Sequence, residues 1–252
     1  MFASKVGRLI LYACLLWQTH QAQASQPQLI FYTEHLPPYS YLQDGEITGI
    51  NVELVNMLCQ RLELSCTISL LPWRRSFELA QQQSYSGVFS TSRTEARESL
   101  FQWIGPIASD WGYLFRLKGR TEVNPSNLDQ AKAFKLAVAR GDVYESYFQS
   151  RGFEYGISMI DFATKTEPVP LFLQGRIDLL VGSKRALRNW MLEHQVPADM
   201  AEPLFKLRNV GDNYLALNRQ FPTELAMQLQ QELDIMRDEG VISSLIQHYT
   251  QE

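Results

Sequence analysis

The hydrophobic and polar positions of this chain follow two patterns in turn. Short apolar runs typical of buried strands are followed by longer segments whose apolar residues recur every three or four positions, as in helices that face a core. In the first such helix the spacing of four runs through Ile50, Leu54, Leu58 and Leu62. Asn51 suits the N-cap of this helix, and Glu53 suits its first turn. The alternation predicts an α/β fold with parallel sheets flanked by helices.

The pattern divides the chain into two successive units. We expect the first unit to contain strands over 29–33 and 67–71 and a helix over 75–82, followed by an extended segment over 111–117. The second unit is predicted to contain strands over 134–138, 156–160 and 178–181, a helix opened by Gly141-Asp142 and a helix over 183–192. A segment over 204–217 and helices over 223–237 and 241–249 complete the predicted order.

The N-terminal segment has the pattern of a secretory signal. Lys5 and Arg8 precede an apolar run over 9–17, and Ala22-Gln23-Ala24 forms a small-x-small cleavage site. We therefore assign residues 1–24 to a signal peptide and expect the mature chain in the periplasm.

Two other interpretations of this segment stay open. A transmembrane anchor is one, although the apolar run is shorter than the about 18 residues that a spanning helix needs. A lipoprotein cleavage box that ends at Cys14 is the other, although Tyr12 fits that box poorly. After residue 24 the sequence contains no further apolar stretch long enough to cross a bilayer.

The charge of the chain excludes one class of partner. The net charge is −4, and removal of the signal leaves 21 basic against 27 acidic residues, a net charge of −6. So acidic a chain is unsuited to bind nucleic acid or an anionic membrane.

Signatures of catalysis are missing from the sequence. The histidines have no metal-ligand spacing, and they are His20, His35, His194 and His248. No Gly-x-Ser-x-Gly elbow, phosphate loop or dinucleotide fingerprint occurs. We therefore predict no catalytic residue, no metal and no cofactor.

Two cysteines remain after the signal is removed. Cys59 and Cys66 lie between a helix end and the start of a strand. In an oxidising compartment we expect a disulfide, worth about 2–3 kcal/mol for so short a loop. Two buried thiols are the alternative.

The segment Ser90-Thr91-Ser92-Arg93-Thr94-Glu95-Ala96-Arg97 is a hydroxyl-rich loop that follows a short strand and enters a helix. Such a loop presents backbone N–H groups and hydroxyls beside a guanidinium, which together suit a small carboxylate. This chemistry indicates recognition and not catalysis.

This loop, together with the segments 31–39 and 49–54 and with Gly175-Arg176-Ile177-Asp178, resembles the bacterial extracellular solute-binding proteins of family 3, the periplasmic receptors for polar amino acids. The resemblance extends from about residue 29 to residue 249. It implies a two-lobed periplasmic binding protein-like fold of type II, with a ligand cleft between the lobes and two hinge crossings, a hinge strand over 111–117 and a return crossing over 204–217. We expect lobe 1 to comprise 25–110 and 211–252, and lobe 2 to comprise 111–210.

The resemblance also implies roles for individual residues of the 90–97 loop. Arg97 matches the family arginine that holds the carboxylate of the ligand, a task suited to a planar guanidinium. Ser92 and the backbone of Ser90 match further donors to the same group. A solvated helix arginine is the alternative for Arg97, with Arg93 as its competitor.

Other positions of lobe 1 match the walls of the family pocket. Trp73 and Tyr39 lie near aromatic positions of that pocket, although each suits a hydrophobic core equally well. Phe89, before the 90–97 loop, is included as a pocket residue. Glu34 lies near an acid that often holds the ammonium of the ligand in the family.

In lobe 2 the strand-to-helix turn at Gly141-Asp142 and the following Tyr144 match donors to the ligand, with helix capping by Asp142 as the alternative. Asp178 matches a family aspartate that is usually structural. One departure from the family concerns the acid that commonly binds the α-ammonium, because this chain has Gly182-Ser183 there. Ser183 cannot neutralise a buried ammonium, so either Glu34 or another acid replaces it or the ligand is not an ordinary α-amino acid.

The resemblance implies a monomeric periplasmic receptor, not an enzyme, that captures a small carboxylate-bearing solute, an amino acid or a relative of one. Its expected partner is the membrane permease of an ABC importer. A ligand-sensing module for a membrane signalling protein and a small periplasmic dehydratase are the alternatives. The sequence does not name the ligand.

Overall fold

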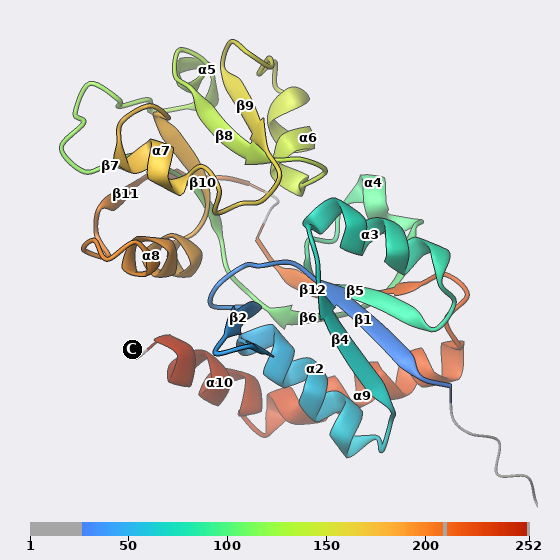
Figure 1. Cartoon of the computed structure of the whole chain (residues 1–252). Helices are drawn as coiled ribbons and strands as arrows, with labels where there is room; N and C mark the ends of the chain where they lie inside the picture. The colour runs from blue at the N-terminus through green and yellow to red at the C-terminus, as the bar shows by residue number, and fades with distance from the viewer. Residues whose placement is uncertain (1–26, 209–210, 251–252) are drawn as a thin grey trace, which may run out of the picture.

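The computed structural model describes residues 27–208 and 211–250, which form two lobes, each built around a five-stranded sheet (Figure 1). The predicted signal peptide over 1–24 lies outside the described residues. The strand order is β4-β1-β5-β12-β6 in the first sheet and β11-β7-β10-β8-β9 in the second. The expected two-lobed α/β architecture is confirmed.

The first lobe contains strands β1 (Leu29–Thr33), β4 (Cys66–Leu70), β5 (Ser86–Thr91), β6 (Phe101–Ala108) and β12 (Asn213–Asn218), and the hairpin β2 (Tyr41–Gln43) and β3 (Glu46–Thr48). Its helices are α2 (Ile50–Arg61), α3 (Trp73–Gln82), α4 (Glu95–Glu98), α9 (Thr223–Asp238) and α10 (Val241–Thr250).

The second lobe contains strands β7 (Gly112–Leu117), β8 (Leu136–Ala139), β9 (Met159–Phe162), β10 (Leu179–Ser183) and β11 (Ala201–Lys206). Its helices are α5 (Leu128–Ala131), α6 (Val143–Gln149), α7 (Val169–Leu173) and α8 (Lys184–Glu193).

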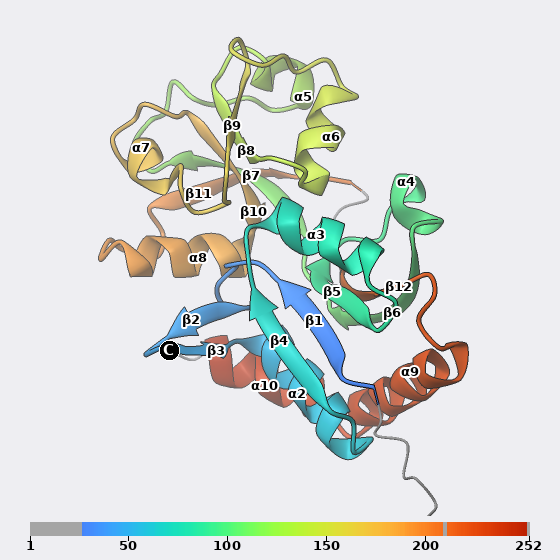
Figure 2. The same ribbon diagram turned by 45° about the vertical axis from the view of Figure 1, so that its right-hand side comes forward.

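The alternation of side chains along β1 divides the core of the first lobe into two layers. Phe31 points into the layer that α2 and α9 cover, whereas its neighbour Tyr32 points to the opposite layer, beneath α3. Since successive side chains of a strand face opposite ways, an apolar strand needs helices on both faces. Figure 2 shows that α3 lies on the face of this sheet that is turned toward the second lobe.

The chain crosses between the lobes in two short connections, one between β6 and β7 and one between β11 and β12. The predicted crossings were too long, because Gly112–Leu117 forms β7 within the second sheet and 204–217 includes parts of both β11 and β12. These residues pair with neighbouring strands, which satisfies their backbone groups. The sheets are also mixed and not wholly parallel, since β12 returns from the second lobe and runs antiparallel to β5 and β6.

Asn51 is not the N-cap of α2, which corrects the prediction. The N-cap is Gly49, with φ of 122°, and a Cβ there would lie 2.6 Å from the backbone carbon of Tyr39. Only glycine accepts both this backbone conformation and this close approach. Asn51 therefore lies one residue inside the helix, fully buried, and its Nδ2 donates to Ser90 Oγ at 2.9 Å.

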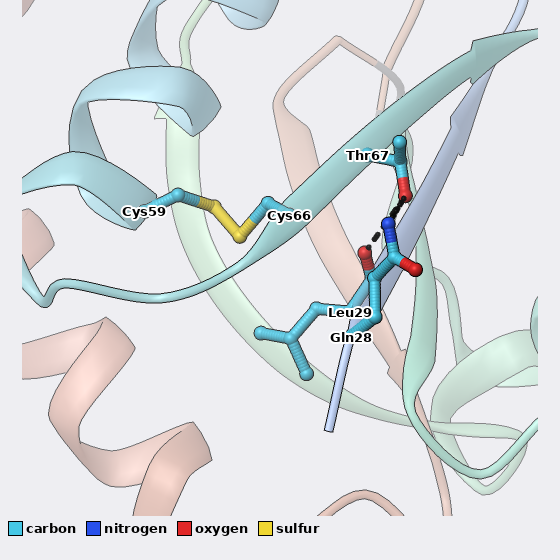
Figure 3. The surroundings of a disulfide bond; sticks show 5 residues. All are labelled: Gln28, Leu29, Cys59, Cys66 and Thr67. Carbon is cyan, nitrogen blue, oxygen red and sulfur yellow. Dashed lines mark hydrogen bonds between the residues drawn. A yellow bond between two sulfur atoms is a disulfide. The ribbon is translucent and has the colours of Figure 1, made fainter. Parts of the chain in front are cut away.

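A disulfide joins Cys59, in the last turns of α2, to Cys66, at the start of β4 (Figure 3). The predicted disulfide is thereby confirmed. The bond fixes the helix end to the edge strand of the first sheet. Within 27–208 and 211–250, no helix has the length and apolar character needed to cross a membrane.

Candidate functional site

A pocket lies between the two lobes, where the ends of β5, β10 and the N-termini of α3, α6 and α8 meet. Eight of the ten predicted ligand-binding residues line it, and they are Tyr39, Trp73, Ser90, Ser92, Arg97, Asp142, Tyr144 and Ser183. The lining also includes residues that the sequence did not single out, among them Asp110, Lys165 and Trp190.

Arg97 extends from the short helix α4 into this pocket. Its Nη1 donates to Thr91 Oγ1 at 3.2 Å, and its Nη2 donates to the carbonyl of Gly141, in the second lobe, at 3.1 Å. The guanidinium lies 4.9 Å from the ring centroid of Phe77 and 5.5 Å from that of Trp73. Among the described residues, no carboxylate oxygen lies within 4.0 Å of it. Burial lowers the pKa of Arg97, although the carboxylates of Asp142 and Glu34 oppose this effect.

Arg93, the competitor of Arg97, lies outside the pocket. Its guanidinium forms a bidentate pair with Glu98 on the surface, at 2.5 and 2.7 Å. It also lies over the rings of Trp103 and Tyr214. The two arginines of the loop therefore have different environments, and only Arg97 faces the other lobe without an acidic partner of its own.

The carbonyl of Gly141 joins the lobes. It accepts a hydrogen bond from Trp73 Nε1 at 2.8 Å and a second one from Arg97. Both donors belong to lobe 1, while Gly141 occupies the turn between β8 and α6 of lobe 2, with φ of 72°. The two side chains thus wall the pocket and hold the lobes together.

Lys165 is the most informative pocket residue that sequence reasoning missed. Its Nζ lies 2.6 Å from Glu34 Oε1 and 2.6 Å from Asp142 Oδ2. The side chains are 14%, 3% and 4% exposed for Lys165, Glu34 and Asp142 respectively. A buried cation is therefore shared by two buried acids, one from each lobe. No local signal marks Lys165, because it lies in the irregular loop between β9 and α7.

The electrostatic environment of this triad follows from its burial. Burial raises the pKa of Glu34, and the nearby Lys165 ammonium only partly offsets that effect. Burial also opposes the charge on Lys165, but the carboxylates of Asp142 and Glu34 outweigh it and raise its pKa. Lys165 is thus held in its charged form at neutral pH.

Glu34 and Phe89 are the two predicted residues that do not line the pocket. Lys165 lines the pocket and donates to Glu34 Oε1, whereas Glu34 itself does not line the pocket. Phe89 was expected beside the ligand, and the structure corrects this. Its side chain is fully buried in the core layer under α2 and α9, because it points to the face of β5 opposite that of Val88.

Ser90, the penultimate residue of β5, lies in the left-handed region, with φ of 61°. Its hydroxyl accepts from Asn51 and lies 3.4 Å from Ser40 Oγ, and Thr33 Oγ1 lies 3.5 Å from it. These buried hydroxyls and the amide fix the turn that begins the 90–97 loop. They explain why a polar residue occupies a fully buried position in α2.

In lobe 2, Asp142 performs two tasks at once. It is the N-cap of α6, where its Oδ1 accepts from the backbone N–H of Tyr144 at 2.8 Å, while its Oδ2 contacts Lys165. Asp142 therefore both caps α6 and lines the pocket, so the two interpretations of this residue hold together. Asp178, expected to be structural, accepts from Arg120 at 2.7 Å and from the backbone N–H of Lys135 at 2.9 Å.

A second polar cluster lies near the crossing between the lobes. Tyr39 Oη donates to Asp110 Oδ2 at 2.6 Å and lies 3.2 Å from Ser183 Oγ, and Arg185 pairs with Asp110 at 3.2 Å. Ser183 is the N-cap of α8, where its Oγ accepts from Ala186 N–H at 3.1 Å. Burial raises the pKa of Tyr39, and Asp110 adds to this effect. Asp110 is thus an acid beside the position where the family acid is missing, but Arg185 already neutralises it.

The residues that the structure describes contain no group of three or more histidine, cysteine, aspartate or glutamate side chains that is suited to hold a metal ion. The chemistry of the pocket is that of a charged and aromatic binding cleft.

Comparison with known proteins agrees with this geometry. The model of the bacterial extracellular solute-binding proteins, family 3, matches residues 29–252. The chain belongs to this family. Among curated members, an arginine-binding periplasmic protein of Mannheimia haemolytica is 23% identical over 188 residues, which cover 74% of this chain and 73% of the relative. The lysine/arginine/ornithine-binding periplasmic protein of Escherichia coli (strain K12) is 20% identical over 221 residues, which cover 86% of this chain and 84% of the relative.

Solved structures share the fold of this family member. An ancestral arginine-binding protein bound to arginine has a TM-score of 0.78 at 16% identity and covers 88% of this chain and 98% of its own. A histidine kinase sensor domain with similarity to periplasmic binding proteins also has a TM-score of 0.78, at 17% identity, and covers 89% and 96%. The same fold therefore occurs in an arginine-binding protein and in a histidine kinase sensor domain.

Proposed function

We propose that this family 3 protein is a periplasmic receptor that reversibly binds a small carboxylate-bearing solute, an amino acid or a relative of one, in the pocket between its lobes. One observation carries the proposal. Arg97 points into this pocket, half-buried and without a carboxylate within 4.0 Å among the described residues. A half-buried guanidinium without an acidic partner favours an anionic guest, and its planar donors suit a carboxylate.

The remaining parts of the proposal concern location and partners. Residues 1–24 act as the signal peptide, and the mature monomer works in the periplasm. It delivers its solute to the permease of an ABC importer. The curated relatives that are named as periplasmic amino-acid-binding proteins support this role.

Ligand capture is proposed to close the lobes about the connection between β6 and β7 and the connection between β11 and β12, a hinge motion of the kind that periplasmic binding proteins make around their ligands. The contacts of Gly141 and Lys165 with lobe 1 are those that such a motion makes and breaks. We keep the division into lobe 1 (25–110 and 211–252) and lobe 2 (111–210) as part of this proposal.

A sensing role is the second candidate. It is favoured by the likeness in fold to a histidine kinase sensor domain. The binding event is the same in both roles, and only the membrane partner differs. A pull-down with the permease and with the signalling protein encoded nearest to this chain distinguishes them. No specific observation favours dehydratase activity, so we do not propose it.

The test is a thermal-shift screen of amino acids and organic acids, each paired with its primary amide, because a ligand that binds only the folded state raises the melting temperature. We expect stabilisation by acids and not by their amides. Arg97→Ala should weaken binding of the best acid by about 2 kcal/mol, roughly thirtyfold in Kd. Arg93→Ala is the matched control, since it removes an arginine of the same loop that lies outside the pocket. Stabilisation by an amide that is undiminished in Arg97→Ala refutes the proposal.

A further inference from the structure

We propose that Lys165 is a built-in counter-ion that fills the acidic part of the pocket, so that the ligand is a carboxylate without a cationic side chain. This inference rests on the proposed function and narrows its substrate class. It separates this chain from the relatives named for arginine, lysine and ornithine.

The first step concerns the acids. Glu34 in lobe 1 and Asp142 in lobe 2 are both buried carboxylates, and Asp142 lines the pocket. Lys165 Nζ lies 2.6 Å from an oxygen of each. A ligand ammonium or guanidinium binds best to buried carboxylates that have no cationic partner. Here the ammonium of Lys165 already forms ion pairs with both acids.

The second step is the charge balance of this part of the pocket. With both acids ionised, the formal charge of the triad of Glu34, Asp142 and Lys165 is −1 (two carboxylates and one ammonium), and Arg97 brings the total to zero. Of the two cations, Lys165 has direct acidic partners, whereas Arg97 donates to neutral oxygens of Thr91 and Gly141. A carboxylate therefore finds an available cation at Arg97, whereas a ligand cation meets a site already occupied by one, which repels it.

The third step concerns the aromatic wall. Lys165 Nζ lies 5.5 Å from the ring centroid of Trp73, and Arg97 lies 5.5 Å from the same ring. Two cations of the protein thus already lie near this ring, and a ligand cation beside it would be repelled by both. The far end of the ligand must consequently be neutral or anionic.

The position of Lys165 also couples this selectivity to lobe contact. Glu34 belongs to the segment after β1 in lobe 1, while Lys165 precedes α7 in lobe 2. The Glu34–Lys165 pair therefore forms only when the lobes meet. A ligand that displaces the ammonium gives up an interlobe ion pair, which adds to the discrimination against cations.

The test compares L-arginine with L-citrulline, which has nearly the same shape but an uncharged side-chain end. Kd values are measured by calorimetry for the wild type and for Lys165→Met, which keeps the length of the side chain and removes its charge. We expect wild type to bind L-arginine no more tightly than L-citrulline. Lys165→Met should raise the preference for L-arginine over L-citrulline at least tenfold, because both acids become available.

Two further variants control the experiment. Lys135→Met removes an exposed lysine of the same lobe and should leave the preference unchanged. Lys165→Met combined with Glu34→Gln leaves only Asp142 uncovered, so we expect a smaller gain in L-arginine affinity. Lys165→Met alone leaves two buried carboxylates without a cation, whereas the double variant leaves only one. The double variant therefore replaces Lys165→Met in the test if Lys165→Met fails to fold.

Three outcomes overturn the inference. The first is tight L-arginine binding by the wild type that Arg97→Ala weakens, and this result leaves the proposed function intact. The second is an unchanged preference in folded Lys165→Met or in the folded double variant. The third is that no carboxylate binds the wild type or any variant, which ends the proposed function together with the inference.

Discussion

Trp73 joins the two lobes through one hydrogen bond, and replacing it with phenylalanine removes that bond while keeping an aromatic ring. In the structure Trp73 Nε1 donates to the carbonyl of Gly141 at 2.8 Å. When the lobes part, water replaces each partner, so the net contribution of such a bond is about 1 kcal/mol. That free energy corresponds to roughly a fivefold change in an equilibrium constant. We therefore expect Trp73→Phe to raise the ratio of open to closed molecules about fivefold in the absence of ligand.

Single-molecule energy transfer measures this ratio. Dyes on Met227→Cys in α9 and on Ile157→Cys before β9 report on lobe 1 and lobe 2, and both positions are exposed. Cys59 and Cys66 are bonded to each other and do not take up dye. Arg97 donates to the same carbonyl of Gly141 and retains part of the interlobe contact, so a larger shift than tenfold is not expected.

Trp103→Phe is the matched control for this prediction. Trp103 Nε1 donates to the carbonyl of Glu98 at 3.1 Å, a bond of the same kind that lies wholly within lobe 1. It should leave the ratio of open to closed molecules unchanged. Identical distributions for Trp73→Phe and wild type, or an equal shift in Trp103→Phe, refute the reasoning that this bond helps to hold the lobes closed.

Three further predictions concern stability. Replacing Cys59 and Cys66 with serine should lower the free energy of unfolding in urea by roughly 2.5 kcal/mol, and a loss below about 0.5 kcal/mol contradicts the loop-closure argument. Leu215→Ala, in the core of the first lobe, should cost about 2–5 kcal/mol in the same assay, whereas Leu42→Ala, which is exposed, should cost less than about 0.5 kcal/mol. Asp142 and Glu34 raise the pKa of Lys165 above the ordinary 10.5. The stability that the charge of Lys165 contributes is therefore fully present below pH 10.5 and is lost as the pH rises through the raised pKa. The melting temperature of the wild type relative to Lys165→Met should therefore stay constant between about pH 7 and pH 9 and fall above about pH 10.5. A difference that stays constant from about pH 7 to pH 12 counts against the buried ion pair.

The sequence by itself determined those features that depend on local pattern. The spacing of apolar residues predicted α2, α9 and α10 close to their observed bounds, since an amphipathic helix must present one face to a core. The order of strands and helices predicted an α/β fold. The 90–97 loop and the other segments that carry the resemblance indicated the family, and that resemblance implied the two lobes. Most of the predicted pocket residues also gather at one place, because they occupy strand ends and helix N-termini that converge in such folds.

Only the tertiary structure decided which charges meet. Lys165 and Glu34 are 131 residues apart, and Lys165 lies in an irregular loop with no periodic pattern. The role of Asn51 as a partner of Ser90 and the place of Phe89 in the core also depend on how separate segments pack. A residue's spacing along the chain fixes the face of an element on which it lies, but the partner of a buried polar group is set by whichever segment the fold brings within hydrogen-bond distance. For this reason the arginine of the proposed carboxylate site was predictable from a motif, whereas the lysine that fills the acidic part of the pocket was not.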